Sequence, residues 1–249
     1  MKAVSPLLPR PFPDTRARAA PPPAEGALHS ATQGRRILLM MVLGACFGPS
    51  WARGLAEAPV EAAVTRLQSD WETIRYQKAA SDREKWFEGL ATKAHMVSET
   101  YEGRAEPLIW EGIVLGSLAQ ERGGLSALPL LKQARSRFEQ ALQIDSQALE
   151  GSAYTGLGVL YCKAPGWPLS FGDKAQARSL LNQALSLQPW GLDPNYFYAE
   201  CLVESHLPDQ ALPYLEKALA APDRPGRPLT DAGLRQDARS LLARIRQAR

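Results

Sequence analysis

Small and large apolar residues recur at helical spacing in the second half of the chain, and the recurrence is itself periodic. Three segments share one order of a small, a large and a second small residue, namely Ala134, Phe138 and Ala141; Ala177, Leu181 and Ala184; and Ala211, Leu215 and Ala218. Each stripe predicts a helix with one apolar face, and the repetition predicts an array of such helices. The last two stripes lie 34 residues apart and the first two lie 43 apart, which indicates a nine-residue insertion.

A further helix is predicted before each stripe, with a small residue at the point where the two helices of a pair would approach closely. Leu115-Gly116 is the best anchor before the first stripe. The residues that precede the other two stripes are Tyr154, Leu157, Gly158 and Tyr161, and then Asn195, Tyr198, Ala199 and Leu202. The chain from about residue 105 is therefore predicted to form three successive helix pairs.

Two helices are predicted before these pairs and one after them. The apolar faces are Val64, Leu67, Trp71 and Ile74; Trp86, Leu90, Ala94, Val97 and Tyr101; and Leu234, Ala238, Leu241, Leu242 and Ile245. We interpret the first two as a degenerate leading pair and the last as the solvated cap that a stacked array requires. Side chains at this spacing are interpreted as core and not as a cofactor site.

The helix pairs resemble the tetratricopeptide repeat (TPR) family, whose period is also 34 residues. The resemblance implies an all-α solenoid of helical hairpins over residues 59–249, with the degenerate leading pair and the C-terminal capping helix at its two ends. It also implies a protein that holds a partner and is not an enzyme.

The residues before this domain have a different composition. Residues 1–33 are rich in proline and arginine, so we interpret them as disordered, or as lying upstream of the true start codon. Residues 34–52 have the order of a secretory signal, with Arg35 and Arg36 before the apolar run 37–47 and small residues after it. The run is too short to span a membrane. We therefore expect export to the periplasm of a Gram-negative bacterium.

Two processing sites are open in this leader. Cleavage after Ala52 would suit an ordinary signal peptide, whereas Leu43 to Cys46 resembles a lipobox in which Cys46 would be the lipid attachment residue of a membrane-anchored lipoprotein. The net charge of the whole chain is only +3, and much of the excess lies in the leader. The folded domain is therefore close to neutral, so its charge gives no reason to expect a nucleic-acid partner.

The TPR resemblance implies that the first helix of each pair lines a concave face. The positions that would face a ligand there are Trp110, Ile113, Ser117, Ser152, Thr155, Val159, Asp193, Tyr196 and Glu200. Trp110 and Tyr196 are the predicted anchors, because exposed aromatic rings offer contact area at low entropic cost. The alternative for Trp110 is packing against the leading helix pair.

The insertion corresponds to the loop 164–174, which carries Trp167 and Phe171. Because water disfavours two such rings together, they must fold back on the array or face a partner. We favour packing and keep partner contact as the alternative. Asp173 is predicted to cap the following helix through its carboxylate.

No motif for catalysis, a metal or a cofactor is present in the sequence. An enzyme that uses Asp173, Glu200 or Glu204 is the disfavoured alternative. Cys162 and Cys201 are predicted to lie on neighbouring first helices. We expect two small buried thiols, and a disulfide is the alternative that an oxidising compartment would permit.

Several short segments also resemble the periplasmic TPR proteins of tripartite ATP-independent periplasmic (TRAP) transporters, the T component. They are Gly166 to Pro168, Phe171 to Lys174, Asp193 to Tyr198, and Ala221-Pro222 with Arg224 to Pro228. This resemblance implies a periplasmic, often lipid-anchored protein that docks a solute-binding protein and assists delivery of a small organic ligand. The competing hypothesis is a general envelope-assembly adaptor, and the oligomeric state is left open.

Overall fold

The structure is a computed structural model that describes residues 50–248, of which residues 50–58 are described only as helical backbone. The predicted disordered segment 1–33, most of the predicted signal segment 34–52 and the possible lipid attachment at Cys46 lie outside the described residues.

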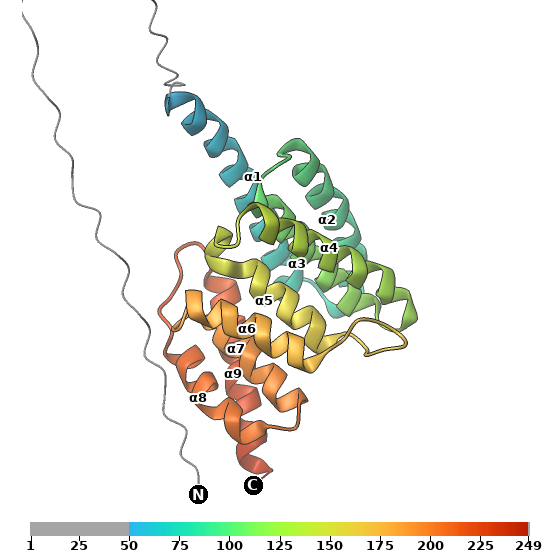
Figure 1. The fold of residues 1–249 in the computed structure, drawn as a ribbon, viewed down its shortest axis with the longest axis vertical. Coiled ribbons are helices and arrows are strands. Elements are labelled where there is room, and N and C mark those ends of the chain that lie inside the picture. Colours follow the sequence, from blue (N-terminus) through green and yellow to red (C-terminus); the bar gives the residue numbers. More distant parts are fainter. Residues whose placement is uncertain (1–49, 249) are drawn as a thin grey trace, which may run out of the picture. The chain divides into compact units, whose positions relative to one another are not determined.

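The described chain is built from α-helices joined by short turns. The helices are α1 (Ser50–Gln77), α2 (Ala80–Thr100), α3 (Ala105–Arg122), the short 3-10 helix η1 (Leu125–Ala127), α4 (Leu128–Ile144), α5 (Ala148–Lys163), α6 (Lys174–Leu187), α7 (Leu192–Glu204), α8 (Pro208–Ala220) and α9 (Pro228–Gln247). Successive helices pack as hairpins, and α9 follows the last hairpin (Figure 1). The all-α hairpin solenoid predicted from the sequence is confirmed.

The odd-numbered helices form an inner row, because α1, α3, α5, α7 and α9 contact one another in chain order. The even-numbered helices each pack on the odd-numbered helices before and after them. The large residue of each predicted stripe is almost fully buried, at 2% exposed or less for Phe138, Leu181 and Leu215. The periodic stripes are therefore the faces that join the helices of each pair.

Close approach in the first two repeat pairs, α3 with α4 and α5 with α6, depends on glycine. A Cβ atom at Gly158 of α5 would lie 2.6 Å from Leu181 Cγ of α6, as the sequence predicts. In the preceding pair, however, the ring of Phe138 lies against Gly112, where a Cβ atom would be 2.8 Å away. At Gly116 a Cβ atom would make only an ordinary contact with Leu160, so the anchor predicted there is wrong by one helical turn.

The leading pair, α1 and α2, is packed as predicted except at one position. Val64, Leu67 and Ile74 are buried, but on α2 the core residue is Phe87 and not Trp86. Trp86 is 50% exposed, and the Lys78 ammonium lies 4.5 Å from the centre of its ring. The predicted apolar face is therefore wrong by one residue at its start, where Trp86 and Phe87 are both aromatic.

The inner row closes on itself because α1 also contacts α9. The Thr230 hydroxyl donates to the buried Glu72 carboxylate at 2.8 Å, and the Gln68 amide donates to the Gly226 carbonyl at 3.2 Å. A Cβ atom at Gly233 would lie 2.1 Å from the ring of Tyr76, so α9 lies directly on α1. This seam joins the two ends of the array.

An ion-pair network holds the turn before α9 against α7. Arg224 donates to Asp193 at 2.7 Å and to Asp231, while Arg227 Nη1 lies 3.4 Å from Asp193. Burial alone would lower the pKa of Arg224, but Asp193 and Asp231 more than offset it and raise that pKa. Arg224 therefore stays charged, and its ion pairs hold the turn before α9 beside α7.

Candidate functional site

Trp110 is a core residue of the leading pair. It is 3% exposed, and its ring packs edge-on against Trp71 of α1 with centroids 6.4 Å apart. The Trp71 indole donates to the Ser117 hydroxyl at 2.8 Å. The prediction of an exposed aromatic anchor at Trp110 is therefore wrong, and the alternative of packing against the leading pair is confirmed.

Tyr196 is also buried, at 7% exposed. Its hydroxyl donates to Glu200 at 3.2 Å, and its ring lies edge-on to Phe197. Burial first and the nearby Glu200 carboxylate second raise the pKa of Tyr196 far above its usual value. Tyr196 is thus a neutral hydrogen-bond donor within the array, and the prediction that its ring is exposed is wrong.

The remaining predicted concave positions lie on the inner helices, as expected, but they do not form an open face. Thr155 is 9% exposed, while Ile113 and Val159 are partly buried. Glu200 remains partly exposed and is paired with Lys163. Ile113 packs against the apolar clusters that its own helix forms with the helices beside it.

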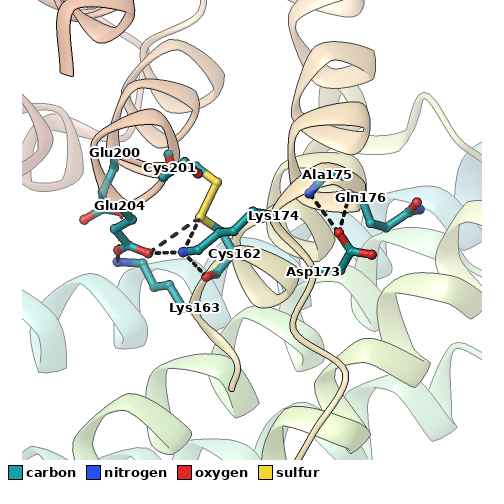
Figure 2. The surroundings of a disulfide bond; sticks show 10 residues. Cys162, Lys163, Asp173, Lys174, Ala175, Gln176, Glu200, Cys201 and Glu204 are labelled. Carbon is teal, nitrogen blue, oxygen red and sulfur yellow. Dashed lines mark hydrogen bonds and ion pairs between the residues drawn. A yellow bond between two sulfur atoms is a disulfide. The ribbon is translucent and has the colours of Figure 1, made fainter. Parts of the chain in front are cut away.

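A disulfide joins two neighbouring inner helices at Cys162 of α5 and Cys201 of α7 (Figure 2). Their Cα atoms lie 5.9 Å apart, a usual separation for a bridge, and both residues are less than 5% exposed. The prediction of two free buried thiols is therefore wrong. The alternation of helices does place these cysteines side by side, but sequence spacing alone carries no signal for the bond.

Four charged side chains surround the disulfide, two lysines and two glutamates (Figure 2). Lys163 pairs with Glu200 at 2.9 Å and with Glu204 at 3.3 Å, and Lys174 pairs with Glu204 at 2.8 Å. Burial would lower the pKa of Lys163, but the two carboxylates raise it further than burial lowers it. Burial would likewise raise the pKa of Glu204, and the two lysines lower it overall.

These pKa directions describe charges that stabilise one another. A general base or nucleophile needs a pKa brought towards neutrality, and the shifts of Lys163 and Glu204 move away from it. Asp173, the third carboxylate considered for catalysis, accepts hydrogen bonds from the backbone of Ala175 at 2.8 Å and Gln176 at 3.0 Å (Figure 2). Its predicted role as the cap of α6 is confirmed.

The loop between α5 and α6 is held in one conformation by its own backbone. Gly172 donates to the Pro165 carbonyl at 2.9 Å, and Asp173 donates to the Tyr161 carbonyl at 2.9 Å. A Cβ atom at Gly172 would lie 1.9 Å from the Ala164 carbonyl oxygen, so only glycine fits there. The loop therefore presents its side chains from a defined position.

The two aromatic residues of this loop differ. Phe171 packs edge-on against Tyr161 with centroids 5.2 Å apart, and the Arg135 guanidinium lies 4.8 Å from its ring centre. Packing is therefore confirmed for Phe171. Trp167 is 90% exposed and the neighbouring Leu169 is 60% exposed, so the favoured prediction of packing is wrong for Trp167.

In the part of the chain that the structure describes, no group of three or more His, Cys, Asp or Glu side chains could hold a metal ion. Over the same residues, no helix is both long and apolar enough to cross a bilayer.

Comparison with known proteins gives a likeness in fold. No protein-family model matches the chain, and no curated protein matches it in sequence. Among solved structures, the chain is similar to TTC0263, a thermophilic TPR protein of Thermus thermophilus, with a TM-score of 0.50 and 16% sequence identity. The match covers 77% of this chain and 95% of that chain. At this identity the likeness shows the TPR-type fold and nothing finer.

Proposed function

We propose that this chain is an exported scaffold that holds a protein partner. The observation that carries the proposal is the stack of helical hairpins itself, because repeat arrays of the TPR type are typically non-enzymatic surfaces for protein binding. The charged residues near the disulfide support it, since they pair with one another. We therefore assign no catalytic residue.

The disulfide supports export. A bond between Cys162 and Cys201 persists in an oxidising compartment and is rare in the reducing cytosol. It agrees with the signal-like order of residues 34–52, which points to the periplasm of a Gram-negative bacterium. Acylation of Cys46 would add a membrane anchor to the same protein.

The finer proposal is that the partner is the solute-binding protein of a TRAP transporter. It rests on the resemblance of the chain from Ala105 to Arg249 to the T component of those transporters. The exposed Trp167 and Leu169 support it, because a fixed loop can offer them to a partner at little entropic cost.

One observation favours the second candidate, an envelope-assembly adaptor without a ligand path. Trp110 and Tyr196 are buried, and α1 contacts α9 across the ends of the inner row. A small ligand would need an open path along these helices, whereas an adaptor needs only outer surface. Delivery of a small ligand is therefore the weaker part of the transporter proposal.

The test is mild crosslinking of the native host envelope, followed by purification of the chain and identification of the attached proteins. Recovery of a solute-binding protein supports the transporter proposal, and recovery of cell-wall or outer-membrane assembly proteins supports the adaptor. The intact mass of the purified chain distinguishes an acylated Cys46 from an unmodified start at Arg53. Absence of any envelope partner would contradict the scaffold.

Two variants add a specific readout to this experiment. Trp167→Ala removes the exposed ring of the α5–α6 loop, so we expect it to reduce recovery of the partner. Trp86→Ala is the matched control, because Trp86 is likewise an exposed tryptophan, at 50%, but lies on α2. Equal recovery with both variants would show that the loop does not contact the partner.

A further inference from the structure

Helices α3, α5 and α7 begin at one edge of the array. The starting turns of α3 and α5 lie close to α1, because Val60 and Val64 of α1 share a hollow with Glu106 at the start of α3 and Leu149 at the start of α5. We infer that this acidic edge, defined by the charged and apolar residues described below, docks a basic amphipathic segment of a protein partner. The inference deepens the proposed scaffold function by naming a surface and the chemistry of its partner.

The first observation is uncompensated negative charge. Four carboxylates of this edge are exposed, and within residues 59–248 none of them belongs to an ion pair; they are Glu61, Glu102, Asp145 and Glu150. The neighbouring arginines already have acidic partners. Arg104 pairs with Glu106 at 2.8 Å, and Arg224 pairs with Asp193 at 2.7 Å. The edge therefore attracts cations while the domain as a whole is close to neutral.

The second observation is exposed apolar surface among these carboxylates. Its residues are Ile144, Leu149, Leu187 and Trp190, which are 46%, 37%, 39% and 66% exposed. Two contacts connect α5 with the end of α6 here. A Cβ atom at Gly151 would lie 2.5 Å from the Leu187 side chain, and the Gln188 amide donates to Glu150. Acidic and apolar side chains thus lie together where α5 begins and α6 ends. The Lys217 ammonium lies 5.3 Å from the centre of the Trp190 ring.

The third observation is the hollow at the α1 end of this surface, whose volume is about 370 Å³. Val60, Val64 and Leu149 are its apolar lining, and Glu61, Thr65, Gln68 and Glu106 line it with polar side chains. Leu149 reaches it from a left-handed backbone conformation, with a φ of 47° that is rare for a leucine. An aliphatic stem that ends in a cation suits such a hollow, because lysine and arginine bury their methylenes and keep the charge outside.

These features select one kind of occupant. A helix with leucine-like residues on one face and lysine or arginine beside them would cover the apolar residues and neutralise the four carboxylates. Anionic bilayers and nucleic acids would be repelled by the same charges. A basic amphipathic protein segment is therefore the partner that this surface fits.

The test measures binding of a short, labelled helical peptide built from leucine and lysine to the full chain by fluorescence anisotropy. We expect saturable binding that weakens as salt is raised. A leucine–glutamate peptide of the same pattern and a serine–lysine peptide are the controls for charge and for apolar contact, and neither should bind comparably. Equal binding of the glutamate peptide would overturn the inference.

Variants locate the binding surface. The double variant Glu61→Gln with Glu150→Gln keeps the shapes and removes two exposed charges, so we expect about fivefold weaker binding. Trp190→Ala should weaken binding to a similar extent by removing apolar contact. Glu216→Gln on α8 and Trp167→Ala on the α5–α6 loop are the matched controls and should bind as the unmodified chain does.

The two proposals fail separately. The acidic edge is overturned as the docking surface if the peptide does not bind, or if its binding does not change in the variants at Glu61, Glu150 and Trp190. Envelope crosslinking could still recover a partner in that case. The opposite outcome is peptide binding that the edge variants weaken, with no envelope protein recovered by crosslinking. It would contradict the proposed scaffold but would still support the acidic edge as a binding surface for basic peptides.

Discussion

Gly158 sets the distance between α5 and α6. A methyl group there would lie 2.6 Å from Leu181 Cγ and 3.3 Å from the Ala177 carbonyl oxygen, so backbone as well as side chain would have to move. Overpacking of this kind costs about 1–3 kcal/mol. We expect Gly158→Ala to lower the free energy of unfolding by that amount, measured by urea denaturation.

The matched control for that substitution is Gly89→Ala in the middle of α2. A Cβ atom at Gly89 would have nothing within 4 Å, so the same change causes no clash. Its effect is to reduce the backbone entropy that the chain loses on folding. It should raise stability by roughly 0.5–1 kcal/mol. If both variants shifted stability in the same direction, close approach would not be the reason for glycine at position 158.

Tyr76 gives the protein a pH dependence in the alkaline range. Its pKa is raised from the usual 10.0 to about 12, mainly by burial, and Asp237 and Asp193 add to the shift. Between these values the unfolded chain releases a proton that the folded chain keeps. The stability that this tyrosine contributes is therefore fully present below pH 10 and is lost as the pH rises through about 12.

The corresponding experiment compares urea midpoints of the unmodified chain and Tyr76→Phe as the pH is raised through this window. The unmodified chain should lose stability more steeply, because phenylalanine has no proton to release. Tyr196 is present in both proteins, so its own contribution cancels in the comparison. Parallel curves would show that Tyr76 is not buried as the structure has it.

At the scale of elements, the disulfide joins α5 to α7 across the intervening helix. The bond closes a sequence separation of 39 residues, for which the loss of chain entropy in the unfolded state corresponds to about 4 kcal/mol. We expect a reductant to lower the urea midpoint of the unmodified chain. The double variant Cys162→Ala with Cys201→Ala should start lower and should not respond to the reductant.

The helices themselves follow from the sequence to a large extent, because most have one apolar face and end at turn residues. The details that failed depend on neighbours outside the helix. Phe87 and Trp86 are adjacent aromatics, and only the packing of α2 on α1 decides which enters the core. Gly112 and Gly116 are likewise one turn apart on α3, and the placement of Phe138 selects Gly112.

The candidate site was harder to predict for a reason that belongs to the whole array. The sequence places Trp110, Thr155 and Tyr196 correctly on the inner helices. Whether those helices line an open face depends on the curvature of the stack and on contact between its first and last members, which are far apart in sequence. Local periodicity contains no information about that closure, so burial of Thr155 and Tyr196 could not be predicted. For Trp110, packing against the leading pair was the alternative that the sequence offered.

At the scale of the whole array, the seam between α1 and α9 has a polar centre that can be tested. Thr230, which is 2% exposed, donates to the Glu72 carboxylate at 2.8 Å. Thr230→Val keeps the shape but removes the donor, and a buried carboxylate that loses a partner costs about 1–3 kcal/mol. We expect faster amide hydrogen exchange in α1 and α9, with little change in α4 to α6.

Thr92→Val on α2 is the matched control, because the Thr92 hydroxyl is exposed and donates only to the Glu88 carbonyl of its own helix. It should leave exchange in α1 and α9 as it is. A uniform rise in exchange with Thr230→Val would mean that the seam unfolds only with the entire array. Faster exchange confined to α1 and α9 would mean that the ends separate while the central pairs stay folded. The contact between α1 and α9 would then open and close in the folded protein, and the residues of the seam would set how often it opens.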